Sequence, residues 1–306
     1  NSRNFANKVW NASRFIMMNI EKAADVSGVT EKDLTLADKW ILSKVNALTK
    51  DVTENLDKYE LGIALQKVYD FIWEEFCDWY IEMVKPRLYN EADETKAAAI
   101  WTLKNVLIQA LKLLHPFMPF ITSEIYAKLV NPDNRDLMVS DWPKANDSIE
   151  YDTSKDFIEN LKDVITQIRN VRANMNVHPS KKTKLIFVTA EYQNEIEQSK
   201  AFIEKLGFAN EITIQNNKDN IPQNAISIIS NGMEVYIPFE ELVDVEEEKK
   251  RLEDEKKKVL AEIERASKML ANPGFVNKAP EAKINEEKAK LNKYQEMLKS
   301  IEERIK

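Results

Sequence analysis

The sequence is poor in the residues that build metal sites and disulfide bonds. It has a single cysteine, Cys77, and two histidines, His115 and His178. One cysteine cannot form an intramolecular disulfide, and three such side chains fall short of a zinc ligand set. We therefore expect no metal site, and the composition indicates a reducing compartment, which we take to be the cytoplasm.

Glycine and proline are also scarce, with five and ten among 306 residues. A chain so poor in turn formers is expected to be helical rather than a β-sandwich or a Rossmann-like fold. No G-x-x-x-x-G-K-[ST], G-x-G-x-x-G or G-x-S-x-G motif occurs, so no motif offers a phosphate cradle or a nucleophile elbow. We accordingly expect no catalytic residues and no cofactor in this chain.

Long apolar runs are absent as well. No uninterrupted apolar segment reaches membrane-spanning length, and residues 1–15 lack the apolar core of a signal peptide. We expect no membrane partner. The sequence has no initiator methionine, and helical periodicity already begins at residue 2, which indicates a piece of a longer polypeptide.

The first 130 residues carry the apolar periodicity of helices. We expect helices over residues 2–24, 35–57, 60–84 and 94–114, and a fifth over 121–130 after the two prolines of HPFMPF. The segment 60–84 is apolar on most of its circumference, which predicts a central helix in which Cys77 is a packed thiol. Together these segments predict an up-and-down helical bundle.

The pattern changes after a linker at residues 131–155. Residues 157–175 and 191–207 have the periodicity of amphipathic helices. Strands are expected at 184–190, 211–215, 225–230 and 233–239, the last two joined by an Asn231-Gly232 turn. A small α+β module is therefore expected after the bundle.

The last third of the chain has heptad spacing. Apolar residues recur in steps of three and four from Leu242 to Leu270, and a second seam, which includes Glu287, runs from Ile284 to Ile305. Asn272-Pro273-Gly274 interrupts the two seams, which predicts an antiparallel coiled-coil hairpin. The fold is thus expected to be mainly α, with a helical bundle at 1–148, a small α+β module at 149–240 and a coiled-coil arm at 241–306.

The formal net charge of −7 disfavours a general polyanion binder, but the charge is segregated along the arm. Residues 241–255 have three basic and eight acidic side chains, whereas residues 256–293 have ten basic and five acidic ones. The distal arm could therefore follow a phosphate backbone, and a solvated coiled coil is the alternative. The candidate contacts are Arg265, Lys268, Lys278, Lys283, Lys288 and Lys290.

A polar face on the first expected helix is the second candidate. Asn7, Asn11 and Arg14 recur at helical spacing, with Trp10 beside them. Asparagine is a poor helix former, so repeated asparagine on one face is costly unless it serves a purpose. Such a face can bond the edges of unpaired RNA bases while an aromatic or guanidinium plane stacks on them. An ordinary solvated helix face is the alternative.

Several stretches resemble a known family. RNFANKVWNASRF, FIWEEFCDWYIEMVKPRL, HPFMPFITSEIY and DWP resemble the anticodon-binding domain of class I aminoacyl-tRNA synthetases of the valyl, isoleucyl and leucyl group. RNVRANMNVHPSKK and the terminal hairpin with NPGFVNKAPEAKINEEKAKL are similar to the C-terminal part of bacterial valyl-tRNA synthetases. The resemblance covers essentially the whole chain, and the nucleotide-binding signatures of class I enzymes are absent from it.

The resemblance implies a function in tRNA binding. The bundle would hold the valine anticodon, with Asn7, Trp10, Asn11 and Arg14 as candidates, and the arm would reach the outer corner of valine-specific tRNA. The parent valine-tRNA ligase would use ATP and Mg, its catalytic and editing domains would be partners of this chain, and the protein would be a monomer. Two alternatives stay open, a protein-interaction scaffold with a coiled-coil hairpin and the equivalent part of another class I synthetase.

Overall fold

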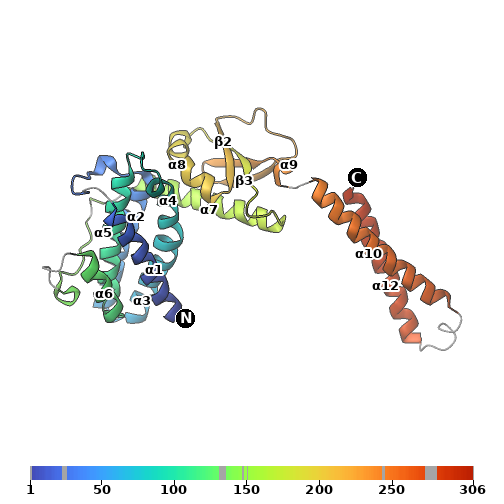
Figure 1. The fold of residues 1–306 in the computed structure, drawn as a ribbon, viewed down its shortest axis with the longest axis horizontal. Helices are drawn as coiled ribbons and strands as arrows, with labels where there is room; N and C mark the ends of the chain where they lie inside the picture. The colour runs from blue at the N-terminus through green and yellow to red at the C-terminus, as the bar shows by residue number, and fades with distance from the viewer. Residues whose placement is uncertain are drawn as a thin grey trace. The chain divides into compact units, whose positions relative to one another are not determined.

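The chain folds mainly into helices, arranged in two compact units, Asn1–Pro238 and Phe239–Lys306 (Figure 1). We describe each unit by itself. The division into three domains stays a prediction. The computed structural model describes residues 2–22, 26–130, 136–146, 148–149, 151–242, 245–272 and 281–305.

A helical bundle forms the first half of unit 1, as expected from the periodicity. α1 shows the principle, because it buries Phe5, Val9, Ser13 and Ile16 at steps of four, four and three and leaves its other faces open. α5 is long and apolar enough to cross a membrane by length and composition, but most of that stretch is buried among its neighbours. The bundle helices are α1 (Ser2–Glu21), α2 (Leu36–Asp57), α3 (Leu61–Asp70), η2 (Phe71–Tyr80), α4 (Ile81–Tyr89), α5 (Lys96–Leu114) and α6 (Pro119–Leu129), with short 3₁₀ turns η1 (Glu31–Asp33) and η3 (Leu137–Val139).

The helix expected at 60–84 differs from the prediction in two ways. Its middle, η2, is a π-helix, in which the backbone N–H of Ile81 donates to the carbonyl of Phe76, five residues back. Its end is also wrong, because the helix continues through Pro86 to Tyr89. Pro86 has no N–H for the carbonyl oxygen of Glu82, and Lys205 Nζ lies 3.4 Å from that oxygen instead.

A buried ion pair ties three bundle elements together. The guanidinium nitrogens Nη1 and Nη2 of Arg87, in α4, each donate over 2.9 Å to one oxygen of Asp38, in α2. The hydroxyl of Tyr80, in η2, donates to Asp38 Oδ1 over 2.6 Å. Asp38 also closes a capping box with Thr35 at the start of α2. The carboxylate is fully buried, so these donors replace its hydration.

The second half of unit 1 is the expected α+β module. Its sheet has the order β2-β1-β4-β3, with β1 and β2 parallel and the other pairs antiparallel. A Cβ on Gly207 would meet Leu185 of β1 at 3.4 Å and Ile168 of α7 at 3.8 Å, so α7 and the end of α8 meet over one face of the sheet. The elements are α7 (Asp152–Asn174), β1 (Thr183–Val188), α8 (Gln193–Leu206), β2 (Ala209–Gln215), β3 (Ile226–Ser230) and β4 (Met233–Ile237).

The module differs from the prediction in the length of its linker and agrees with it in the turn between β3 and β4. α7 begins at Asp152, so the linker is shorter than expected. The two-residue turn between β3 and β4 is confirmed, with Ser230 paired to Met233 and Gly232 at a φ of +76°. A Cβ at Gly232 would lie 2.6 Å from the ring of Tyr192, so glycine is required there for both reasons.

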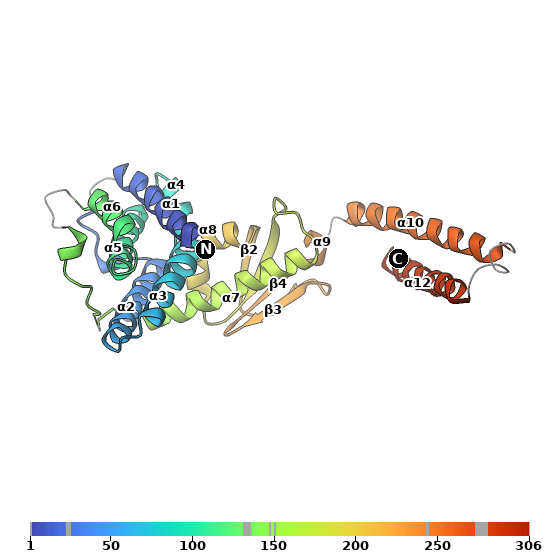
Figure 2. The same ribbon diagram turned by 90° about the horizontal axis from the view of Figure 1, so that it is seen from below.

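Unit 2 contains the coiled-coil hairpin. After α9 (Phe239–Leu242), α10 (Val245–Ala271) and α12 (Glu281–Ile305) pack along each other, and α12 returns antiparallel to α10 (Figure 2). The predicted seam is confirmed around Val259, which packs with Ile263, Tyr294 and Leu298. Pro273 and Gly274 lie outside the described residues.

Candidate RNA-binding surfaces

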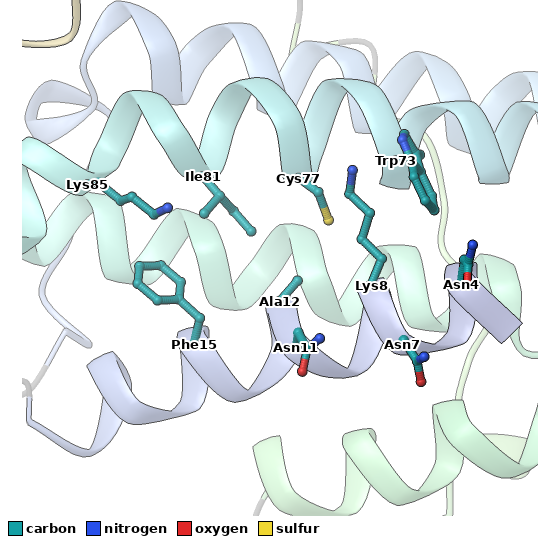
Figure 3. Close-up of a pocket in the computed structure, with 10 residues that line it drawn as sticks. All are labelled: Asn4, Asn7, Lys8, Asn11, Ala12, Phe15, Trp73, Cys77, Ile81 and Lys85. Atoms are coloured by element: carbon teal, nitrogen blue, oxygen red, sulfur yellow. The ribbon is translucent and has the colours of Figure 1, made fainter. Parts of the chain in front are cut away.

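A groove of about 560 Å³ runs between α1 and the wall formed by η2 and α4 (Figure 3). The α1 side contributes polar residues and an aromatic ring, and the opposite wall contributes Trp73, Cys77 and Ile81 (Figure 3). A groove that combines amide groups, cations and aromatic faces suits ligands that both stack and form hydrogen bonds. Its lining residues are Asn4, Asn7, Lys8, Asn11, Ala12, Phe15, Trp73, Cys77, Ile81 and Lys85.

The two lysines of the groove are held over aromatic rings. The ammonium of Lys8 lies 3.9 Å from the ring centroid of Trp73 and 2.6 Å from an oxygen of Asp78. Lys85 lies 5.6 Å from the ring centroid of Phe15 and pairs with Glu82. In both contacts a cation lies within reach of a π face, and a carboxylate on η2 or α4, Asp78 or Glu82, balances its charge.

Cys77 forms part of the groove wall but is not a nucleophile. Only 9% of the residue is exposed, which confirms the predicted packed thiol. Burial raises the pKa of the Cys77 thiol to about 12. The thiolate is therefore a negligible species at neutral pH, and the side chain serves as packing.

A second hollow of about 270 Å³ extends the groove beyond Phe15, which lines both. It adds Asn19, Tyr89, Lys22 and Lys96, again an amide, a ring and two cations. Lys96 is already paired with Glu91 over 2.8 Å. The side of α1 that faces α4 is thus hollowed along most of the helix.

The four predicted bundle residues do not share one site. Asn7 and Asn11 line the groove, so the structure brings these two together. Trp10 does not line it; its ring lies under the ammonium of Lys128 in α6, at 5.0 Å. Arg14 is exposed on α1 and lines neither hollow.

Among the groove residues, sequence reasoning found only Asn7 and Asn11. Lys8 and Phe15 lie on the helix face next to the predicted set. Their helical spacing was visible in the sequence, because Lys8 follows Asn4 by four residues and Phe15 follows Lys8 by seven. Trp73 comes from the segment 60–84 that the sequence marked only as apolar and central, and Lys85 lies just beyond its predicted end. Their contact with α1 depends on tertiary packing, which no local pattern carries.

The predicted arm residues differ in their partners. Arg265 Nη1 lies 3.3 Å from a carboxylate oxygen of Glu262, and Lys268 Nζ lies 2.6 Å from Glu264. Lys283 and Lys288 are exposed and make no ion pair of 4.0 Å or less with a described residue. Lys278 lies outside the described residues.

Lys290 has more carboxylate partners than the other described candidate cations of the arm. Its ammonium lies 2.8 Å from Glu286 and 2.9 Å from Glu287, and these bonds raise its pKa to about 12. Glu287 is only 9% exposed because it sits in the coiled-coil seam. Lys290 is therefore needed to neutralise a nearly buried carboxylate, whereas Lys283 and Lys288 pair with no described carboxylate.

Comparison with known proteins gives two family matches. Residues 38–187 match the anticodon-binding domain of tRNA ligases, and residues 244–306 match the valyl-tRNA synthetase tRNA-binding arm. The first match includes the η2 and α4 wall of the groove but begins after α1. Neither match is a catalytic domain.

Several longer proteins that are similar to this chain are all named valine–tRNA ligase. The chain is 47% identical over 305 residues to a valine–tRNA ligase of Clostridium acetobutylicum and 46% identical over 305 residues to one of Clostridium perfringens. The chain belongs to the valyl-tRNA synthetase family. A valine–tRNA ligase of Carboxydothermus hydrogenoformans is 43% identical over 309 residues.

The chain covers only part of these family members. Each of the three alignments includes 99% of this chain and 34% of the relative, so the chain spans about a third of their length. The predicted resemblance is confirmed, and the arm match favours the valyl group over other class I synthetases.

Proposed function

We propose that this chain is the tRNA-binding part of a valyl-tRNA synthetase that holds valine-specific tRNA while the parent enzyme charges it with valine. The parent would use ATP and Mg, and its catalytic and editing domains would be the partners of this chain within one cytoplasmic, monomeric protein. The two family matches support the binding role, and the relatives' name supports the amino acid.

The groove of the bundle is proposed to hold unpaired nucleotides of the anticodon loop. The observation that carries this proposal is that one groove is lined by the rings of Phe15 and Trp73 and by the amides of Asn7 and Asn11. Unpaired bases are bound by stacking on aromatic rings and by hydrogen bonds to their exposed edges, and both kinds of group are present. Arg14 and Trp10 would then serve as flanking contacts outside the groove.

The arm is proposed to contact the phosphate backbone at the outer corner of the tRNA. A lysine that forms no ion pair with a described carboxylate has no such pair to break when it binds a phosphate, which favours Lys283 and Lys288 among the described candidates. Arg265 and Lys268 would exchange a surface carboxylate for a phosphate, and exposed pairs of this kind are worth about 0–1 kcal/mol. Such contacts position the RNA without reading its sequence.

Binding far from the reaction can still raise its rate. Remote contacts fix the acceptor end of the tRNA in the distant active site, so their free energy is used to orient the reacting groups. The function of this chain is therefore proposed to be positioning, and the chain by itself is expected to bind tRNA without charging it.

The experiment is a titration of the 306-residue chain with three RNAs at several salt concentrations. The RNAs are valine tRNA, valine tRNA with a substituted anticodon, and a non-cognate tRNA. We expect affinity to fall with salt for all three and to be highest for the intact valine tRNA. Equal affinity for all three would contradict the anticodon assignment, and no binding at low salt would favour a protein-interaction scaffold.

A substitution in the groove sharpens this test. Phe15→Ala should weaken binding of valine tRNA by about 1–3 kcal/mol, the usual contribution of one stacked base. The matched control is Phe120→Ala in α6, because Phe120 is 91% exposed and lies outside the groove. Equal affinities of the two variants would show that Phe15 does not hold a base.

A further inference from the structure

The π-helix η2 has two functional sides. Trp73 and Cys77 face α1 and form the wall of the groove (Figure 3). Glu75 and Trp79, two residues further along in each case, face α7 of the α+β module instead. One segment is therefore both the wall of the groove and the surface on which the module is seated.

Lys162 of α7 is the centre of the contact behind the wall. Its ammonium lies 2.6 Å from Glu75 and 3.0 Å from Glu159, and only 9% of the residue is exposed. The same ammonium lies 4.8 Å from the ring centroid of Trp40 and 5.6 Å from that of Trp79. Burial of a charge is costly unless it is paired, and here two carboxylates and two π faces surround it.

The neighbouring charges complete a small network. Lys44 of α2 lies 2.9 Å from Glu159 and 3.2 Å from Glu75, and the indole N–H of Trp40 donates to Glu159 over 2.9 Å. Burial alone would raise the pKa of Glu159, but the bonds from Trp40 and Lys44 and the charge of Lys162 lower it to about 2. The network joins α2, η2 and α7, and Lys162 is the group common to its carboxylates and rings.

The conformation of η2 makes it dependent on such contacts. Extended π-helices are rare because their hydrogen-bond geometry is less favourable than that of an α-helix, and those that occur are frequent at functional sites. A ten-residue π-helix has to be held by what packs around it. A change on the side of Glu75 and Trp79 is therefore expected to move Trp73 and Cys77 on the other side.

We propose that Lys162 is a positioning residue for RNA binding, which fixes η2 from behind so that Trp73 and Cys77 keep their place in the groove wall. This inference rests on the proposed function, since the ligand of the groove is taken to be unpaired nucleotides of the anticodon loop. It extends that function to the module, because a residue of α7 that touches no RNA sets the shape of the site.

The first test measures RNA affinity with an RNA hairpin that carries the valine anticodon. Lys162→Met removes the charge and keeps a long side chain, and it should raise the Kd about tenfold. Lys162→Arg keeps a cation between Glu75 and Glu159 and should return the Kd to within about threefold of the unsubstituted chain. The matched control is Lys67→Met, which breaks the exposed Lys67–Asp51 pair of 2.9 Å between α3 and α2 and should leave the Kd within about twofold.

The second test reads the wall directly, without RNA. Cys77 is the single cysteine, so the rate at which a thiol reagent labels it reports on that wall alone. The control is Ile125→Ala, a core variant in α6. Each variant is labelled at the urea concentration that gives the two the same free energy of unfolding. Under these conditions Lys162→Met should be labelled about tenfold faster than Ile125→Ala. This comparison separates a shift of η2 from general loss of stability.

The outcomes distinguish the two claims. If the unsubstituted chain binds no hairpin, the proposed function fails, and the inference fails with it. If the hairpin binds the unsubstituted chain and Lys162→Met equally well, and Cys77 of this variant is labelled no faster than in Ile125→Ala, Lys162 is only a structural ion pair and the inference alone is overturned. Weaker binding together with faster labelling supports it.

Discussion

The buried pair of Asp38 and Arg87 gives a prediction whose size follows from the structure. Asp38 is fully buried and Arg87 is 9% exposed, so neither charge is well hydrated. Burial by itself lowers the pKa of Arg87, but the charge and hydrogen bonds of Asp38 outweigh it and raise the pKa. Removing one partner of such a pair leaves a buried charge uncompensated and costs about 3–5 kcal/mol.

The value for Arg87→Met should be near the lower end of that range. Asp38 would keep the hydroxyl of Tyr80 and both the N–H and the hydroxyl of Thr35 as donors. We therefore expect a loss of about 3 kcal/mol from the free energy of unfolding, a large share of the about 5–15 kcal/mol typical of a domain. Arg87→Met combined with Asp38→Asn should recover about 1 kcal/mol or more, because no buried charge remains.

The assay is urea unfolding followed by tryptophan fluorescence. All six tryptophans lie before residue 143, so the signal reports on unit 1 and not on the coiled coil. Lys67→Ala is the control, because the Lys67–Asp51 pair is exposed and should contribute about 0–1 kcal/mol. A loss below about 1 kcal/mol for Arg87→Met, or a double variant no more stable than the single one, would refute the reasoning.

Two further predictions concern the charges. The double variant Lys283→Ala/Lys288→Ala should reduce the slope of log Kd against log salt for valine tRNA by about 0.7–0.9 per lysine. The double variant Arg265→Ala/Lys268→Ala should reduce this slope by less. Equal reductions would contradict the role of the carboxylate pairs. Because the pKa of Glu159 is lowered to about 2 in the folded chain, its stabilisation is present above pH about 4.5 and is lost as pH falls towards 2. In Glu159→Gln, the loss of unfolding free energy on acidification, measured by urea unfolding at several pH values, should be smaller by about 1–2 kcal/mol. This is less than the full pKa shift implies, because 37% of the side chain is exposed. An unchanged pH profile would contradict the prediction.

Local periodicity was enough to predict the helices that bury one regularly spaced apolar face. α1 and α2 follow from their apolar spacing, and the coiled coil follows from heptads, including Glu287 in the seam. The spacing of three and four constrains which side chains face inward whatever the neighbours are. The bounds of these elements therefore agree with expectation to within a few residues.

The groove could not be predicted because it depends on two facts outside local pattern. The run from Phe71 to Tyr80 is apolar on several sides, so it fits an α-helix and a π-helix equally well. Pro86 looks like a helix end, yet the helix continues through it, and Lys205, far along the chain, lies 3.4 Å from the carbonyl oxygen of Glu82 that the proline leaves free. The sequence therefore identified Asn7 and Asn11 but not the opposite wall of the groove.

The proposed RNA contacts of the arm would let an acidic chain present positive charge to a phosphate backbone. Glu262 and Glu264 hold Arg265 and Lys268 one helical turn away, which keeps the cations ordered at little energetic cost. A phosphate that replaces such a carboxylate has only a weak pair to break, so these residues can add affinity at low salt and lose it at high salt. Lys290 cannot exchange in this way, because the nearly buried Glu287 would lose its partner. Contacts of this kind give affinity without sequence preference, so the proposed function assigns the preference for the valine anticodon to the groove of the bundle.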